Sequence, residues 1–335
     1  MTKSRDLFLR GQSPSHHQFG TSQLIETGEY KVDYFLVAPK VRKNKFLKLI
    51  SIIPIWIKTF FKARKYDIVY GAADFTVDFL GMLKKAKLFR PKLIAIFHHP
   101  PFEQKLKVEK FDKILFLSHY ALEDISSKFP NLRQSMEFFQ WGPDLDFYKR
   151  IEPVPNYQKN KKELIFISNG KTHRDHETLF EAAVKTGNKT IIVSDEWSLP
   201  LNFNKLCKNV EIFYQNKPDD TKMLKLLSNC SVLVIPTFPD NQRLGPIGLT
   251  SFVDAIAMGI PIISANNTVF DNIIIEHKMG LVYEAGNPTD LGRVMDVFKE
   301  NPELVVQYGK NAFNFGQTHD IKAFGMQLYH LLHNI

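Results

Sequence analysis

The chain has 335 residues, of which 44% are hydrophobic and 24% charged, a balance typical of a globular protein with enough apolar material for two cores. The two cysteines, Cys207 and Cys230, argue against a disulfide framework and fit a reducing cytoplasm. The opening residues lack the apolar core of a signal peptide, and no apolar run reaches the ~18 residues of a membrane-spanning helix. We therefore expect a cytoplasmic protein. Its net charge of +9 favours an anionic partner, either nucleic acid or a membrane surface.

Short apolar segments alternate with helical segments along the whole chain. Strands alternating with helices predict an α/β fold with parallel, doubly wound sheets, and the number of strands indicates two such sheets. The segment 146–162 has two prolines, many charges and no periodicity, which indicates an exposed linker and a domain boundary near residue 150. The predicted strands cover residues 6–9, 31–37, 67–70, 93–97 and 113–117 before the linker, and 164–167, 190–193, 210–213, 232–235, 261–264 and 280–282 after it.

The most informative segment begins at Gly248 and reads GLTSFVDAIAMGIPIIS. The predicted strand 232–235 leads through a loop into a helix whose first turn carries Thr250 and Ser251. The unpaired amides and the dipole of a helix N-terminus favour an anion, so this turn is predicted to hold phosphate. Asp254, one turn further along, adds a carboxylate that can accept hydrogen bonds from hydroxyl groups.

This segment is similar to the pattern G-x-T-S-x-x-E-A-M-A-x-G-x-P-V-I of the group 1, or family 4, glycosyltransferases. Residues 164–183, LIFISNGKTHRDHETLFEAA, resemble the first strand, glycine loop and helix of the donor domain in the same family. The resemblance is clearest over residues 163–308. It implies a GT-B fold, in which two Rossmann-like, doubly wound parallel-sheet domains face a cleft. We expect an acceptor-side domain over residues 1–149, a nucleotide-sugar donor domain over 150–315, and a helix over 316–335 that packs back on the first domain.

The resemblance also implies a donor site. Lys171 and Arg174 fall where the family contacts the leaving diphosphate, and Gly170 lets the backbone approach the phosphates. Asp254 falls on the position of the glutamate that binds the ribose hydroxyls, and it is one methylene shorter. The remaining residues assigned to the donor site are Gly248, Leu249, Thr250 and Ser251, which grip the diphosphate, and Tyr214.

One position departs from the family pattern. Many members carry a second glutamate, which contacts the donor sugar, eight positions before the first, and Pro246 stands there in this chain. Proline offers neither a carboxylate nor an amide hydrogen. Sugar selection is therefore expected to rest on other groups, such as Asp240, Asn241 or the amides of Gly245 and Ile247.

Histidines occur at two further places that the resemblance brings into the site. His98 and His99 follow the predicted strand 93–97, where family members often carry a histidine near the reactive carbon of the sugar; they could equally cap a loop. The loop 11–20, GQSPSHHQFG, is implied to cover the diphosphate and to help form the acceptor site through Gly11, His16 and His17. The four histidines lack Cys, Asp or Glu partners at metal-ligand spacing, and the resemblance implies no metal and no cofactor.

The implied reaction moves a sugar from a nucleoside-diphosphate sugar to an acceptor hydroxyl, with retention and without metal. Cationic side chains and the helix N-terminus would stabilise the departing diphosphate, and no protein nucleophile is needed. Two alternatives stay open. One is a nucleotide-sugar epimerase on the same fold. The other is a non-catalytic GT-B partner subunit, which the proline at 246 and the short Asp254 would explain.

The segment 41–65 contains eight Lys or Arg residues and no acid, interleaved with large apolar residues at helical spacing, although Pro54 is expected to break or kink it. We interpret it as a possible docking element for an anionic membrane, which would make the acceptor a lipid-linked glycan or a surface polysaccharide intermediate and place the enzyme on the inner face of the plasma membrane. Alternatively, its apolar residues pack under the first sheet. No nucleic-acid-binding module is recognisable, so no nucleic acid partner is expected.

Overall fold

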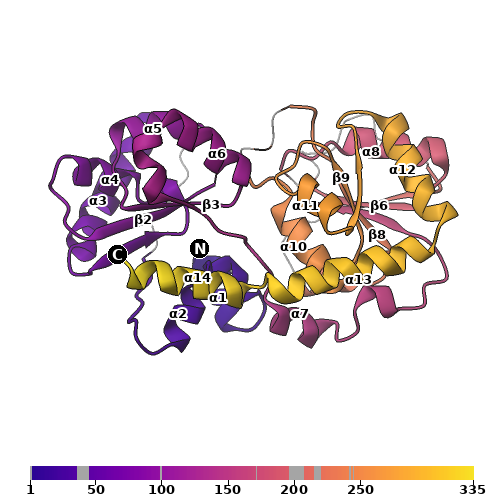
Figure 1. Ribbon diagram of the computed structural model, residues 1–335, viewed down its shortest axis with the longest axis horizontal. Coiled ribbons are helices and arrows are strands. Elements are labelled where there is room, and N and C mark those ends of the chain that lie inside the picture. Colours follow the sequence, from indigo (N-terminus) through magenta and orange to yellow (C-terminus); the bar gives the residue numbers. More distant parts are fainter. Residues whose placement is uncertain are drawn as a thin grey trace. The chain divides into compact units, whose positions relative to one another are not determined.

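The computed structural model describes residues 2–35, 45–98, 100–170, 172–195, 207–214, 220–240, 243 and 245–335. The chain forms two compact units. Unit 1 comprises Met1–Lys3, Gln18–Gln140 and Gly325–Ile335, and unit 2 comprises Ser4–His17 and Trp141–Phe324. Figure 1 shows a sheet flanked by helices in each unit. The sequence therefore predicted the α/β class and the two parallel sheets correctly.

Unit 1 contains a parallel sheet in the order β1-β2-β3-β4. The central strand β2 is almost wholly buried, which explains its continuous apolar run LIAIF. The strands are β1 (Ile68–Gly71), β2 (Lys92–Phe97), β3 (Lys113–Phe116) and β4 (Met136–Phe138), and the helices are α2 (Thr21–Glu26), α3 (Lys45–Ala63), α4 (Asp78–Lys85), α5 (Phe102–Val108) and α6 (His119–Lys128). Short 3-10 turns lie at Asp74–Thr76 and Pro130–Ser135.

Two strand predictions for the first 140 residues were wrong, and one strand was missed. The segment 6–9 belongs to the helix α1 (Thr2–Leu9) and is not a strand, because a short apolar run has no periodicity that separates the two. Residues 31–35 have no regular structure, and the rest of the predicted strand 31–37 lies outside the described residues. Strand β4, only three residues long, was not predicted.

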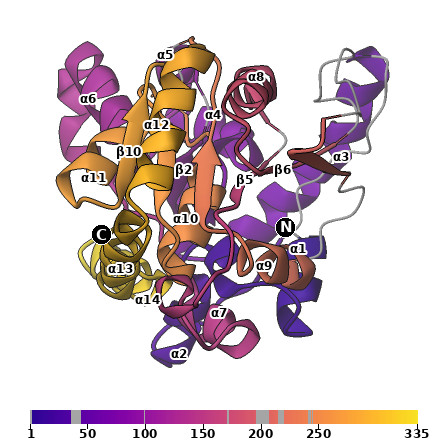
Figure 2. The same cartoon turned by 90° about the vertical axis from the view of Figure 1, so that its right-hand side faces the viewer.

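Unit 2 contains a parallel sheet in the order β10-β9-β8-β5-β6-β7, seen from its side in Figure 2. The strand order reverses where β5 lies between β6 and β8, and open α/β sheets bind ligands at the carboxyl ends of the strands at such a point. The strands are β5 (Phe166–Asn169), β6 (Thr190–Ser194), β7 (Val210–Tyr214), β8 (Val232–Ile235), β9 (Ile262–Ala265) and β10 (Gly280–Tyr283).

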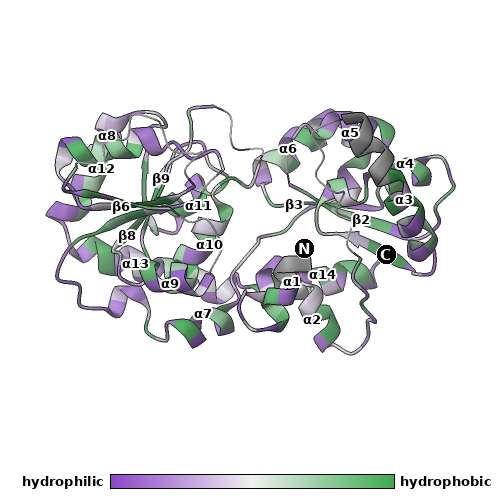
Figure 3. Ribbon diagram, turned by 180° about the vertical axis from the view of Figure 1, so that it is seen from behind, coloured by the Kyte–Doolittle hydropathy of each residue, from purple (hydrophilic) through white to green (hydrophobic). Residues whose placement is uncertain are grey.

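Helices cover both faces of this sheet. In Figure 1, α8 (His176–Thr186) and α12 (Pro288–Glu300) lie on one side, and α10 (Leu249–Met258) and α13 (Glu303–Thr318) lie on the other. Residues of α8 and α12 form one buried apolar core with the strands, and Figure 3 shows the strands as the most hydrophobic elements. The remaining helices of the unit are α7 (Leu145–Ile151), α9 (Asp220–Leu227) and α11 (Asp271–Glu276), with 3-10 turns at Ser15–Gln18 and Asn156–Gln158.

The segment predicted as an exposed linker is partly ordered into unit 2. Phe147 and Tyr148 of α7 are buried, as is Asn156, whose amide donates to the carbonyl oxygens of Leu227 and Cys230 at 3.1 Å. The linker prediction was therefore wrong here, because its buried residues are spaced too widely to give a periodic signal.

The chain ends in α14 (Ile321–His333), which begins in unit 2 and belongs to unit 1 from Gly325 onward. Within unit 1, Gln327 donates to the carbonyl oxygen of Phe138 at 3.0 Å, and the Tyr329 hydroxyl donates to Glu29. Within the described part of the chain, no helix has the length and apolar character that crossing a membrane requires.

Candidate functional site

The loop after β5 places a buried arginine at the point where the strand order of unit 2 reverses. Arg174 pairs in an isolated antiparallel bridge with Thr237, which follows β8, so the loop is anchored between these two strands. Gly170 opens the loop with φ of 131°, a conformation that glycine adopts without strain. The Arg174 guanidinium lies directly against Gly170.

Arg174 is only 7% exposed and carries its charge without a compensating carboxylate among the described residues. Its Nη2 donates to Ser251 Oγ at 3.2 Å and its Nη1 donates to the carbonyl oxygen of Thr172 at 3.1 Å. Its buried Nε has no hydrogen-bond partner. Burial lowers the pKa of the guanidinium to about 10, which still leaves it charged at neutral pH. An unpaired buried cation is costly, and an anionic ligand would relieve that cost.

The first turn of α10 lies beside this arginine. Gly248 caps the helix with φ of 87°, and a Cβ there would collide with Ile235 and Phe270, so the position requires glycine. The buried Ser251 donates to the carbonyl oxygen of Asn169 at 2.9 Å and thereby joins the helix to the end of β5. Thr250 is exposed and Leu249 is buried. The helix dipole and a guanidinium thus act at one place, and both favour a negative charge.

Asp254 lies one turn further along α10 and is 7% exposed. Its Oδ1 accepts a hydrogen bond from the Tyr148 hydroxyl at 2.6 Å, and its Oδ2 accepts one from Asn169 Nδ2 at 3.1 Å. Burial raises the pKa of Asp254 to about 7, while the two hydrogen bonds oppose the shift. Hydrogen bonds therefore connect Tyr148 of α7 to Asp254 of α10 and on to Asn169 at the end of β5. From Asn169 they continue through Ser251 to Arg174.

A buried histidine forms a hydrogen bond with the first residue of the loop after β5. His176 Nε2 lies 3.2 Å from the carbonyl oxygen of Gly170 and 3.1 Å from Ser194 Oγ. Burial lowers the pKa of His176 to about 4, so the imidazole is neutral at pH 7. Because a carbonyl oxygen can only accept, Nε2 carries the proton. This donor fixes the carbonyl group of Gly170 and with it the start of the loop.

The loop 11–17 belongs to unit 2. The carbonyl oxygen of His16 accepts from Trp141 Nε1 at 2.9 Å, and that of Gly11 accepts from Arg150 at 2.8 Å. The imidazole of His16 is buried and stacks over Tyr148 with ring centroids 6.1 Å apart, and His17 contacts the same cluster through the His16 and Trp141 rings. Burial lowers the pKa of both histidines.

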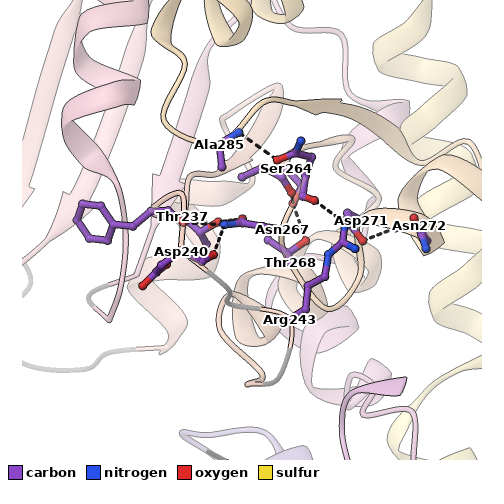
Figure 4. A network of polar contacts seen from close by, with 12 residues as sticks. Thr237, Asp240, Arg243, Ser264, Asn267, Thr268, Asp271, Asn272 and Ala285 are labelled. Atoms are coloured by element: carbon purple, nitrogen blue, oxygen red, sulfur yellow. Dashed lines mark hydrogen bonds and ion pairs between the residues drawn. The ribbon is translucent and has the colours of Figure 1, made fainter. Parts of the chain in front are cut away.

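A second polar network fixes the loops after β8 and β9 (Figure 4). Asn267 accepts from Thr237 Oγ1 at 2.6 Å and donates to the carbonyl oxygens of Phe238 and Asp240 at 2.6 and 2.8 Å. Arg243 pairs with the buried Asp271 at 2.8 Å. These contacts join the residues that follow β8, as far as Asp240, and Arg243 to the loop after β9. Asn241 lies outside the described residues.

The other predicted residues lie in different places. Lys171 and His99 lie outside the described residues. Tyr214, at the end of β7, is 43% exposed. His98 belongs to unit 1, where its Nε2 donates to the carbonyl oxygen of Ala72 at 2.7 Å. In the described ranges, no group of three or more His, Cys, Asp or Glu residues is arranged to hold a metal ion.

Sequence reasoning missed Tyr148, Asn169 and His176. Asn169 carried a usable signal, because it ends a strand at the edge where parallel sheets bind ligands. Tyr148 ends the segment FQWGPDLDFY, which is similar to the family signature N-G-V-D-x-x-x-F, but nothing in that segment indicates that its hydroxyl reaches a carboxylate 106 residues away.

Several solved structures share this fold. Sucrose-phosphate synthase from Thermosynechococcus elongatus superposes with a TM-score of 0.65 at 15% identity, covering 90% of this chain and 84% of that one. HepE from Anabaena, in complex with UDP, gives a TM-score of 0.66 at 14% identity, covering 94% and 89%. WaaG, a glycosyltransferase involved in lipopolysaccharide biosynthesis, gives 0.61 at 13% identity, covering 93% and 94%. No curated protein matches the chain in sequence.

The two parallel-sheet, Rossmann-like units and these structural neighbours define a GT-B fold. Residues 148–315 match the model of the family described as glycosyl transferases group 1. The chain belongs to this family, and it is a glycosyltransferase.

Proposed function

We propose that the enzyme transfers a sugar from a nucleoside-diphosphate sugar to an acceptor hydroxyl, with retention and without a metal ion or other cofactor. The observation that carries the proposal is the buried Arg174, for which the described residues provide neither a hydrogen-bond partner at Nε nor a balancing carboxylate. A diphosphate supplies the missing negative charge. The first turn of α10 adds amide donors at the same place.

These groups serve the difficult step of the reaction, in which an anionic diphosphate leaves. The bond from C1 of the sugar to the phosphate oxygen breaks while the acceptor oxygen bonds to C1 from the same face. The acceptor's proton passes to the leaving phosphate oxygen, so no protein nucleophile is required. Arg174 and the α10 terminus stabilise the developing charge, and removing one such donor typically costs ~100-fold or more in rate. Lys171 is proposed as a second cation on the sequence evidence alone.

The nucleoside is proposed to bind beside the diphosphate, with its ribose hydroxyls at Asp254 and Tyr214 nearby. The structural relative HepE is described in complex with UDP and with UDP-glucose, which makes UDP the first nucleotide to test. The sugar is proposed to bind at the residues that Asn267 contacts, because Pro246 offers a sugar hydroxyl neither a carboxylate nor an amide hydrogen. His98 and His99, and the loop with Gly11, His16 and His17, are proposed to complete the sugar and acceptor subsites.

A thermal-shift screen with UDP, GDP and ADP tests the donor site, followed by release of nucleotide from matching nucleotide sugars. We expect one nucleotide to raise the melting temperature of the native protein, and Arg174→Met to abolish that rise. If none of the three raises it, the donor-site proposal fails. Turnover that releases a free epimerised sugar without acceptor would favour the epimerase alternative.

A second observation concerns α3 in unit 1. One face of this helix packs inward, since Trp56 stacks on Phe79 at 5.3 Å and Phe60 approaches Phe89 at 6.2 Å. The sequence alternative, in which the apolar residues pack under the sheet, describes this face. Contrary to expectation, the helix also continues through Pro54 without interruption.

From Ile53 onward, the other face of α3 carries exposed apolar residues. Ile53, Ile57 and Phe61 follow one another at single-turn spacing and are 45%, 52% and 61% exposed. Lys58, Arg64 and Lys65 border this stripe on the same helix or just beyond it. Aliphatic and aromatic groups flanked by cations match an anionic lipid surface. We propose that α3 docks the enzyme on the inner face of the plasma membrane, and that the acceptor is a lipid-linked glycan or surface polysaccharide intermediate. Residues 41–44 of the predicted element lie outside the described residues.

A further inference from the structure

The carboxylate proposed to bind ribose already has two partners. Tyr148 and Asn169 each donate one hydrogen bond to Asp254, at 2.6 and 3.1 Å. An ionised carboxylate offers about four lone-pair positions, so about two remain for a ligand. Because both oxygens are held, the direction of those remaining lone pairs is fixed by α7 and by the end of β5.

The neighbouring amide is itself incomplete. Asn169 donates to Asp254 through Nδ2, and its buried Oδ1 has no hydrogen-bond partner among the residues that the structure describes. Asn169 is 7% exposed. A buried acceptor without a donor is uncommon, and it indicates that a ligand supplies the donor. Two adjacent acceptors, the carboxylate and this amide oxygen, suit a pair of neighbouring hydroxyl groups.

We propose that Tyr148 is a positioning residue of the nucleoside subsite: its hydroxyl orients Asp254 so that the carboxylate and Asn169 Oδ1 together accept the ribose hydroxyls. The inference rests on the proposed function. Tyr148 itself touches no ligand. It compensates for the aspartate, which is one methylene shorter than the family's glutamate, by fixing it in a single orientation.

The charged and titratable groups around Asp254 determine what losing this donor does. Tyr148 lies on α7, Asp220 on α9 and Arg174 on the loop before α8. The His16 ring stacks on the Tyr148 ring, and His17 contacts the His16 ring. Burial and Asp220 raise the pKa of Asp254, whereas the Tyr148 and Asn169 hydrogen bonds lower it. Removing the tyrosine hydroxyl therefore raises this pKa further. A protonated Asp254 loses acceptor capacity, so affinity for the ribose hydroxyls falls as the pH drops through the pKa.

The test compares the affinity of the full-length protein for UDP with that for 2′,3′-dideoxy-UDP, which lacks both ribose hydroxyls, by calorimetry between pH 6 and 9. GDP and ADP, with their dideoxy forms, replace UDP if they bind instead. Titration of the diphosphate affects both ligands and cancels in the ratio. A hydrogen bond to a charged group is worth ~1.5–3 kcal/mol, which corresponds to a ratio of about ten or more in the native protein.

We expect Tyr148→Phe to reduce this ratio about tenfold at pH 7, with recovery at higher pH, and to leave dideoxy-UDP and inorganic pyrophosphate binding unchanged. Asp254→Asn should give a reduced ratio that does not change with pH, which keeps the inference testable if Tyr148→Phe folds poorly. Tyr283→Phe is the matched control: Tyr283 is another buried tyrosine of unit 2, and its hydroxyl has no hydrogen-bond partner in the described structure. This control should keep the native ratio.

Two results would overturn the inference: a ratio near one in the native protein, or an unchanged ratio in Tyr148→Phe at every pH. A purely structural role would weaken UDP, dideoxy-UDP and pyrophosphate equally and would also overturn it. Failure of the proposed function looks different, because the native protein would then bind none of the nucleotides.

Discussion

The Arg174 guanidinium occupies the space that a side chain at Gly170 would need: a Cβ built on Gly170 lies 2.7 Å from Nη2 of Arg174. This close approach, together with the bridge from Arg174 to Thr237, holds the buried guanidinium in one position. Gly170 therefore has two roles. It adopts the positive φ of 131° with which the loop begins, and it leaves room for the guanidinium to pack against the backbone.

Gly170→Ala is expected to push the guanidinium away from Ser251 and weaken nucleotide binding about tenfold or more, the effect of losing one hydrogen bond to a charged group. Gly187→Ala is the matched control, because Gly187 also has a positive φ, of 69°, but a Cβ there meets nothing within 4 Å. The control should lose stability through backbone strain and keep nucleotide affinity. Equal affinities in the two variants, measured by calorimetry, would contradict the role assigned to Gly170.

Arg174→Met should raise the melting temperature by about 2–4 °C while abolishing the shift that nucleotide produces. The substitution removes a desolvated cation whose Nε is unpaired and leaves a side chain of similar length. Arg243→Met should do the opposite, because it leaves the buried Asp271 without its ion pair. A lower melting temperature for Arg174→Met would show that the guanidinium stabilises the unliganded fold.

His176 should make the protein sensitive to acid. Its pKa is about 4 in the folded chain and ~6.5 when unfolded, so the unfolded chain binds the proton first as the pH falls. The contribution of the neutral imidazole is complete above pH ~6.5 and is lost progressively toward pH ~4, for a total on the order of 3 kcal/mol. His176→Gln should therefore lose less unfolding free energy between pH 7 and 5 than the native protein does. Urea unfolding at both pH values measures this, and His330→Gln, at an exposed position on α14, should behave like the native protein.

Replacing Ile53, Ile57 and Phe61 with serine should abolish co-sedimentation with anionic vesicles. The three side chains form the exposed stripe of α3, and the lysines beside them cannot hold the protein at physiological salt without apolar insertion. Val306→Ser changes an exposed apolar residue of α13 in unit 2 and should have no effect. Equal pelleting of the native protein with anionic and zwitterionic vesicles would remove the electrostatic part of the proposal.

Dialysis against EDTA should leave nucleotide affinity and turnover unchanged, because Arg174 and the α10 terminus are proposed to take the place of a metal ion at the diphosphate. Adding Mg²⁺ or Mn²⁺ afterwards should change neither quantity by more than about twofold. Activity that depends on the added ion would refute metal independence.

The sequence by itself determined the fold class, and it identified most of the residues now proposed to bind the diphosphate. Alternating apolar segments placed most strands correctly because a buried parallel strand is a continuous apolar run, as in β2 and β8. The α10 motif could be recognised from the sequence because the first turn of the helix, its capping glycine and its hydroxyl residues are neighbours in the chain. Gly170 and Arg174 could be identified together for the same reason, because they are close in the chain.

Only the tertiary structure decided how these parts are joined. That Arg174 is buried without a carboxylate depends on what surrounds it, and no local pattern encodes an absent partner. Asp254 was recognised from its motif, but its bond to Tyr148 joins residues 106 positions apart, on two helices whose packing the sequence does not specify. Likewise, the apolar residues of the basic segment could be identified from sequence, but which face is buried and which is exposed depended on where Trp56 meets Phe79. Hydrogen bonds and packing contacts between distant segments exist only after the chain has folded, and therefore only the folded structure could reveal them.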